Sequence, residues 1–98
     1  MTALEVLRAG RANVKAGWTK GAYRRGQSFC ARGAIDAACD QEQWKTKLDA
    51  RRLFAIAIGT ESIEDWNDHP RRTKSEVLGA FDAAMSLALD GADCGDVP

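Results

Sequence analysis

The densest group of side chains capable of chemistry surrounds the only histidine of the chain, His69. Two adjacent arginines, Arg71 and Arg72, follow it after a proline, directly before a predicted helix start. The dipole and unpaired amides of a helix N-terminus favour phosphate or carboxylate groups there. The sequence therefore predicts an anion-binding or partner-binding group of His69, Arg71 and Arg72. The alternative is that these arginines pair with nearby acids such as Glu64 or Glu76.

The same histidine could serve a cysteine nucleophile. Cys30, His69 and either Asn67 or Asp68 supply the thiol, the base and the orienting group of such a site. Their spacing matches no local signature of a thiol enzyme, and a thiol buried in the small-residue segment around Cys30 would have a raised pKa. The sequence therefore leans against an enzyme and assigns no catalytic residue.

Zinc binding would need all three cysteines. The only full set of four ligands joins His69 to Cys30, Cys39 and Cys94, and these separations fit no known zinc module. An odd number of cysteines without motif spacing is typical of reduced thiols in an intracellular protein. We therefore expect neither a metal nor a cofactor.

A second polar group flanks Trp66. Glu64, Asp65 and Asp68 carry the oxygen ligands that magnesium and calcium prefer, but their spacing is not that of a calcium loop. Asn67 and Asp68 favour turns because their side chains bond to nearby backbone. The sequence predicts that Trp66 anchors this loop against the helices, with Asn67 and Asp68 forming a turn beside it.

Charge is distributed unevenly although the net charge is zero. Residues 1–52 hold eleven Lys and Arg against five Asp and Glu, which gives +6, whereas residues 53–98 hold three against nine, which gives −6. Seven basic residues lie between Glu5 and Asp36 with no acid among them: Arg8, Arg11, Lys15, Lys20, Arg24, Arg25 and Arg32. This block predicts either an anionic partner or two halves that face and neutralise each other.

Helices must position these groups, and two of them carry clear start signals. Thr2 and Thr73 each precede a glutamate by three residues, which is the spacing of a capping box. Apolar residues then recur at helical spacing, to about Val14 in the first segment and to a stop at Gly91 in the last. The chain should therefore begin and end with a helix.

Two further helices are predicted between them. One covers residues 28–39, with Ser28 as its cap and many small side chains that let a neighbouring backbone approach closely. The other covers residues 42–57, with Asp40 as its cap and Gly59 as its stop. The residues expected on its apolar face are Trp44, Leu48, Ala55 and Ile58.

The remaining segments are predicted to be loops. Residues 15–26 contain three glycines without a sustained period, with room for one helical turn around 18–23. A short turn of helix at 63–66 leads into the Trp-Asn-Asp loop, and no stretch alternates as a strand does. The fold class is therefore all-α, a compact single-domain bundle of about four helices over residues 1–91. An acidic, disordered tail is expected at 92–98.

Several short motifs follow one another along the chain. They are Gly17-Trp18-Thr19, Gly21-Ala22-Tyr23, Phe29 to Ile35, Ile63, Trp66-Asn67-Asp68, Thr73, Glu76-Val77-Leu78, Asp82 and Ala83. Together they resemble a family of small uncharacterised domains encoded by actinobacteria and their phages. The resemblance spans most of residues 2–89, although the loop before Phe29 is shorter here. It implies a compact intracellular helical domain, and neither a function nor a catalytic residue carries over.

Composition and hydropathy indicate where in the cell the protein is expected. The longest apolar run, residues 53–58, is far below the roughly 20 residues that cross a membrane. Glu5 and Arg8 interrupt any apolar core of an N-terminal signal peptide. We expect a cytoplasmic protein, in the host cytoplasm if a phage encodes it, without contact to a membrane.

These observations rank three functions. The first is an interaction module that binds a host or self protein through the basic segment 8–32 or the loop 66–72. The second is nucleic-acid binding without sequence preference. Sequence-specific binding is disfavoured, because a last helix that contacts bases would need Arg, Asn or Gln beyond Lys74. The third, least favoured, is a hydrolase-like enzyme that uses Cys30 and His69. The basic residues that would contact nucleic acid are Arg8, Arg11, Lys15, Arg24 and Arg25.

Overall fold

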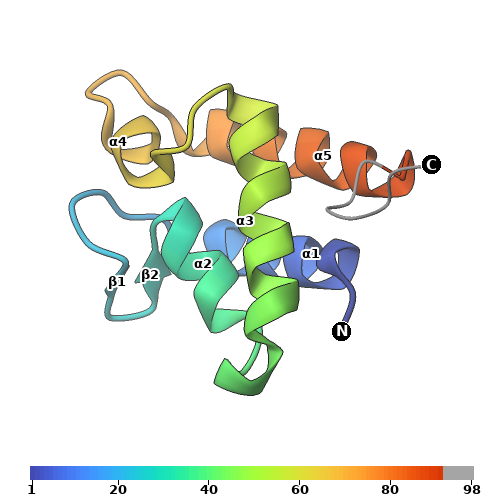
Figure 1. The fold of residues 1–98 in the computed structure, drawn as a ribbon. Coiled ribbons are helices and arrows are strands. Elements are labelled where there is room, and N and C mark those ends of the chain that lie inside the picture. The colour runs from blue at the N-terminus through green and yellow to red at the C-terminus, as the bar shows by residue number, and fades with distance from the viewer. Residues whose placement is uncertain (92–98) are drawn as a thin grey trace.

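A computed structural model describes residues 1–91 as five α-helices and one short β-hairpin (Figure 1). The helices are α1 (Ala3–Ala16), α2 (Ala31–Ala37), α3 (Trp44–Ile58), α4 (Ile63–Asp68) and α5 (Lys74–Leu89), with a 3₁₀ turn at Gln41–Gln43 before α3. The strands β1 (Arg24–Arg25) and β2 (Ser28–Phe29) pair antiparallel. The all-α prediction is confirmed, and the hairpin is the feature it did not foresee. The predicted tail at 92–98, with Cys94, lies outside the described residues.

Both predicted capping boxes are present. The Thr2 hydroxyl accepts a hydrogen bond from the Glu5 amide, and the Glu5 carboxylate accepts one from the Thr2 amide. Thr73 and Glu76 repeat this arrangement at the start of α5. The bonds from the threonine amides lower the pKa of both glutamates. The first and last helices therefore begin where the sequence indicates.

The core lies where α3 crosses the pair formed by α1 and α5, as Figure 1 shows. The rings of Phe54 and Phe81 meet edge to face with their centroids 4.8 Å apart. At Gly10 a β-carbon would lie 2.9 Å from the Phe81 ring, so this glycine lets α1 approach α5 closely. The largest fully buried side chains are Phe54, Phe81, Leu7, Ile35, Leu53, Val6, Val14, Val77 and Asn67.

The start of the second helix differs from the prediction. Helix α2 begins at Ala31 rather than at Ser28, and its cap is the Cys30 thiol, which accepts a hydrogen bond from the Gly33 amide at 3.3 Å. Ser28 instead belongs to β2, because the Phe29 amide donates to the Gly17 carbonyl at 2.9 Å and keeps this segment extended. The predicted helical turn at 18–23 is likewise absent from the described chain, where this stretch leads into the hairpin.

Helix α3 turns a different face to the core than predicted. Its buried residues are Ala50, Leu53 and Phe54, whereas Trp44 and Leu48 of the predicted face are 55% and 47% exposed. Ile58 of that face is partly buried and packs against the core. The helix carries two apolar rows, and the core accepts the one that holds the phenylalanine. Periodicity alone cannot choose between two such rows.

The boundaries of α3 and α4 follow the sequence more closely. Gly59 ends α3 in the left-handed conformation with φ of 79°, as predicted for a stop residue. Asp40 precedes the 3₁₀ turn but makes no capping bond with its side chain. Helix α4 runs to Asp68, two residues beyond the predicted turn. Among residues 1–91, no helix is both long and apolar enough to cross a membrane.

Candidate functional site

The predicted anion-binding residues do not gather around one pocket. The Arg72 guanidinium lies 4.0 Å from the centre of the Trp66 ring, donates to the Trp66 carbonyl at 2.9 Å and pairs with Glu76 at 3.5 Å. The Arg71 amide donates to Nδ1 of His69 at 3.1 Å, and both of these side chains are exposed. Arg72 therefore forms an ion pair with a nearby acid, which was the alternative to anion binding, while His69 and Arg71 lie on the surface beside it.

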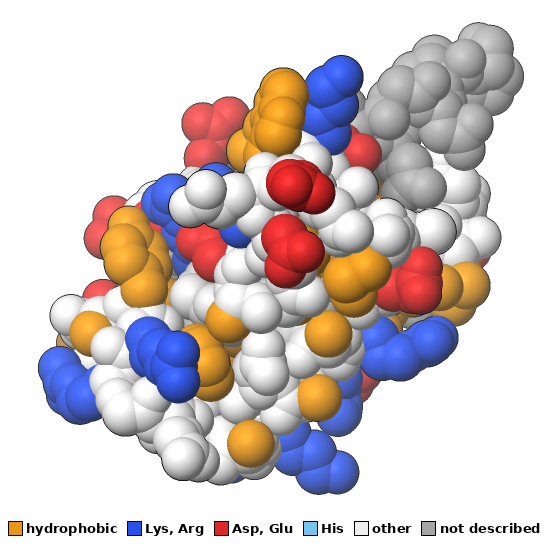
Figure 2. All heavy atoms as spheres, turned by 90° about the horizontal axis from the view of Figure 1, so that it is seen from below, with side chains coloured by type: hydrophobic (Ala, Val, Ile, Leu, Met, Phe, Trp, Pro, Cys, Tyr) orange, Lys and Arg blue, Asp and Glu red, His pale blue; other side chains and the backbone are white. Residues whose placement is uncertain are grey.

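The basic segment 8–32 is also partly engaged within the molecule. Arg11 pairs with Asp82 of α5 at 2.8 Å. The Lys20 ammonium donates to the carbonyls of His69 and Pro70 at 2.7 and 3.3 Å, and Arg24 donates to the Gly26 carbonyl at 2.8 Å. Arg8, Lys15 and Arg25 are exposed. Figure 2 shows basic, acidic and hydrophobic side chains interspersed over one face, without a continuous basic area.

Asn67 is fully buried at the centre of a hydrogen-bond network that we call the Asn67 network. Its Oδ1 accepts from the Trp18 indole at 2.8 Å and from the Ala31 amide at 3.0 Å. Its Nδ2 donates to the Thr19 carbonyl and to Asp68, both at 3.0 Å. The side chain therefore joins α4 to the loop after α1 and to the start of α2, with partners up to 49 positions away. This network differs from the sequence prediction, in which the Asn67 side chain bonds to nearby backbone in a turn.

The neighbours of Asn67 extend the same connection. Asp68 also accepts from the Gly21 amide at 3.0 Å. Trp66 packs edge to face against Phe54, with ring centroids 5.8 Å apart. Together these contacts attach the Trp-Asn-Asp segment both to the core and to the loop before the hairpin.

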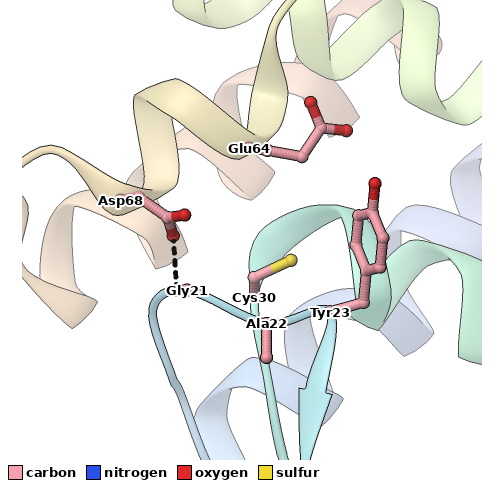
Figure 3. Close-up of a pocket in the computed structure, with 6 residues that line it drawn as sticks. All are labelled: Gly21, Ala22, Tyr23, Cys30, Glu64 and Asp68. Carbon is pink, nitrogen blue, oxygen red and sulfur yellow. Dashed lines mark hydrogen bonds between the residues drawn. The ribbon is translucent and has the colours of Figure 1, made fainter.

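A cavity of about 440 Å³ opens beside the Asn67 network. In Figure 3, Glu64 and Asp68 of α4 lie on one side of the cavity, and Cys30 and the loop of Gly21–Tyr23 lie on the other. Burial raises the pKa of the Cys30 thiol, which therefore stays protonated as a weak nucleophile. His69 does not line the cavity, so the cavity does not bring the Cys30 thiol and the His69 imidazole together. The lining residues are Gly21, Ala22, Tyr23, Cys30, Glu64 and Asp68.

Glu64 also lines a second hollow of about 500 Å³, where it forms an ion pair with Arg32. The hydrogen bond from Arg32 lowers the pKa of Glu64, and the same bond raises the pKa of Arg32. The Arg32 guanidinium also lies 5.2 Å from the centre of the Tyr23 ring. The Arg32–Glu64 and Arg11–Asp82 ion pairs both join the basic first half of the chain to the acidic second half.

Removal of this pair should give a modest, pH-dependent loss of stability. The Glu64 side chain is 32% exposed, so we expect E64Q to lower the free energy of unfolding by only about 1 kcal/mol at pH 7. Because folding lowers the pKa of Glu64, its contribution is complete above the unfolded value of about 4.3 and disappears as pH falls through the folded pKa.

Urea unfolding of both proteins between pH 7 and pH 3 measures this difference. E61Q, which makes the same change at an exposed glutamate, is the control. A gap between E64Q and the original protein that persists unchanged at pH 3 would contradict the ion-pair assignment.

A row of exposed hydrophobic side chains runs along the outer side of α3. Trp44, Leu48 and Ile56 are 55%, 47% and 54% exposed. Trp44 and Leu48 are four positions apart and lie on the same side of the helix, and Ile56 lies eight positions further along, beyond Arg52. The Lys45 ammonium lies 5.5 Å from the centre of the Trp44 ring. We call Trp44, Leu48 and Ile56 the α3 row. The sequence did single out Trp44 and Leu48 as an apolar face, but it placed that face in the core.

Comparison with known proteins identifies a family without a known activity. The model of a family of unknown function (DUF6197) matches residues 1–87. No curated protein matches the chain, and no solved structure does either. The function of the protein must therefore be inferred from the surfaces and cavities described above.

Proposed function

The chain belongs to this family of unknown function, and because no activity comes with it, we propose from the molecule's own surface that it is a protein-interaction module acting through the α3 row. The observation that supports the proposal is the exposure of Trp44, Leu48 and Ile56, each about half accessible. Exposed apolar side chains scattered singly are ordinary, but a row of them on one helix is typical of a binding surface. Tryptophan is also enriched among the residues that dominate binding energy.

The inner side of α3 makes this surface rigid. Leu53 and Phe54 are buried in the core, and Gly59 ends the helix with a defined turn. A partner would therefore meet a preformed helix face and would not have to order it, which lowers the entropic cost of binding.

Nucleic-acid binding through the basic segment has less support. Arg11 and Arg24, two of the five basic residues considered for it, already bond within the molecule. Phosphate binding without sequence preference needs several available cations along one surface. The partner in our proposal is therefore a protein, either of a host cell or a second copy. A phage or actinobacterial origin and a cytoplasmic location belong to the same proposal and rest on the resemblance in sequence alone.

An affinity capture experiment tests the interaction. The tagged protein, the double variant W44A/L48A and the control L89A are each incubated with cytosol and the bound proteins are identified by mass spectrometry. Leu89 is 70% exposed and lies on α5, so L89A removes a comparable side chain from another surface.

We expect one stoichiometric partner with the original protein and with L89A. With W44A/L48A, binding should fall at least about 30-fold, because two anchor residues of about 1 kcal/mol or more each are removed. Equal capture by all three proteins would show that the α3 row is not the binding surface.

A further inference from the structure

The cavity of about 440 Å³ beside the Asn67 network is a candidate site separate from the α3 row. Its walls combine the Tyr23 ring, the Ala22 methyl group and the Cys30 thiol with the carboxylates of Glu64 and Asp68 (Figure 3). Ligand sites of this size are typically clefts with apolar walls and a few charged or polar groups that orient the ligand. We propose that this cavity binds a small primary amine in its ammonium form.

The two carboxylates of the cavity leave one negative charge without a matching cation. Arg32 pairs with Glu64, so the charge of that glutamate is balanced. Asp68 forms no ion pair with any of residues 1–91. Lys20, in the loop beside it, donates its ammonium to the two backbone carbonyls that follow Asp68 in sequence. A ligand with a single positive charge would balance the remaining carboxylate.

The Asp68 carboxylate is held in place with one oxygen still available. Its Oδ1 accepts from the Gly21 amide and from Asn67 Nδ2, both at 3.0 Å. Its Oδ2 accepts no hydrogen bond from the part of the chain that the structure describes. An ammonium can therefore donate to Oδ2 without displacing an existing bond, and the carboxylate does not have to be ordered when the ligand binds.

The Cys30 thiol is exposed to the same negative charge. It is only 2% exposed to solvent, and burial is the main cause of its raised pKa. The charges of Asp68 and Glu64 raise this pKa further, so both carboxylates act at the wall of the cavity. A negative field that disfavours a thiolate favours a bound cation, and the protonated thiol adds no charge of its own.

An organic ammonium suits this lining better than a metal ion. Among residues 1–91, no group of three or more His, Cys, Asp or Glu side chains is arranged to hold a metal. A primary ammonium carries three N–H donors and can leave some of them to water, so one fixed carboxylate oxygen is enough to orient it. Its carbon chain can then contact the Tyr23 ring and the Ala22 methyl group, which a metal ion would leave unused.

An NMR titration of the ¹⁵N-labelled full-length protein with n-butylamine hydrochloride at pH 7 tests the site. An alkylamine has a pKa near that of lysine, about 10.4, and is therefore an ammonium at this pH. We expect saturable shifts of the Gly21, Ala22 and Cys30 amide signals, with a Kd of about 1–10 mM for so small a ligand. n-Butanol has the same chain length without the charge and should bind at least about 10-fold more weakly.

Two substitutions on α4 test which carboxylate holds the ammonium. D68N keeps an oxygen that can accept from Gly21 and Asn67 but removes the negative charge, so the amine should bind at least about 10-fold more weakly. D65N removes an exposed acid of the same helix that does not line the cavity, and it should leave binding unchanged.

The outcomes separate this inference from the proposed function. Equal binding of the amine and the alcohol, equal binding of the amine to D68N, or shifts that do not saturate would each overturn the ammonium site. The comparison of the two ligands uses the original protein, so it decides the matter even if D68N does not fold. W44A/L48A should bind the amine as the original protein does. Loss of binding in that variant would place the amine at the α3 row and overturn the inference.

Discussion

Replacement of Gly33 by alanine is expected to lower the free energy of unfolding by about 3 kcal/mol or more. A β-carbon at this position would lie 1.8 Å from the carbonyl oxygen of Tyr23 and 2.6 Å from its carbonyl carbon. Both atoms belong to the backbone, so no side-chain rotation relieves the overlap and the segment at Tyr23, which leads into β1, must move away from α2. Overpacking of a buried position usually costs about 1–3 kcal/mol, and a clash with main chain lies at the upper end or beyond.

Urea unfolding measures this change, and G79A is its matched control. Gly79 lies within α5, where a β-carbon would meet nothing within 4 Å. Since alanine favours a helix over glycine, G79A should raise the free energy of unfolding by about 0.5–1 kcal/mol. Similar stabilities for G33A and G79A would mean that α2 and the hairpin do not pack as closely as described.

The variant N67A should have an effect of the same size for a different reason. It removes both acceptor bonds of Oδ1 and both donor bonds of Nδ2, and it leaves the Trp18 indole, the Ala31 amide and the Thr19 carbonyl without this partner. Each buried polar group left unpaired costs about 1–3 kcal/mol, so a loss of about 3 kcal/mol or more is expected.

N13A provides the comparison in urea unfolding. Asn13 donates one side-chain bond, to the Ala34 carbonyl at 3.1 Å, so its loss should be nearer 1 kcal/mol. The variant N67D separates charge from shape, because it places a second carboxylate next to Asp68. Burial and the neighbouring acid raise the pKa of such a group, so N67D should regain stability as pH falls and the carboxyl binds a proton. A loss below 1 kcal/mol in N67A would contradict the central role of this side chain.

The sequence predicts those features of the fold that depend on neighbours in the chain. The Thr2–Glu5 and Thr73–Glu76 boxes and the stop at Gly59 each require only a few adjacent residues, and all three are confirmed. The start of α2 was predicted at the wrong residue because pairing of Ser28 with Arg25 in the hairpin decides it.

The candidate surfaces show the same limit. The partners of Asn67 are far away in sequence, so the short pattern Trp-Asn-Asp indicates a turn and gives no sign of the network. Trp44 and Leu48 of the α3 row belong to the apolar face that the sequence predicts, whereas Ile56 does not, and their exposure depends on which side of α3 meets Phe81. Tertiary packing therefore decides both whether a conspicuous residue is structural and whether an apolar one is available to a partner.

Because α1 packs against α5, a nascent chain cannot close its core until α5 has left the ribosome. The ion pair between Arg11 and Asp82 joins residues 71 positions apart, and Gly10 of α1 meets Phe81 of α5. Contacts between such distant segments form late and slow folding. During synthesis the apolar side of α1 would therefore stay exposed until α5 is complete.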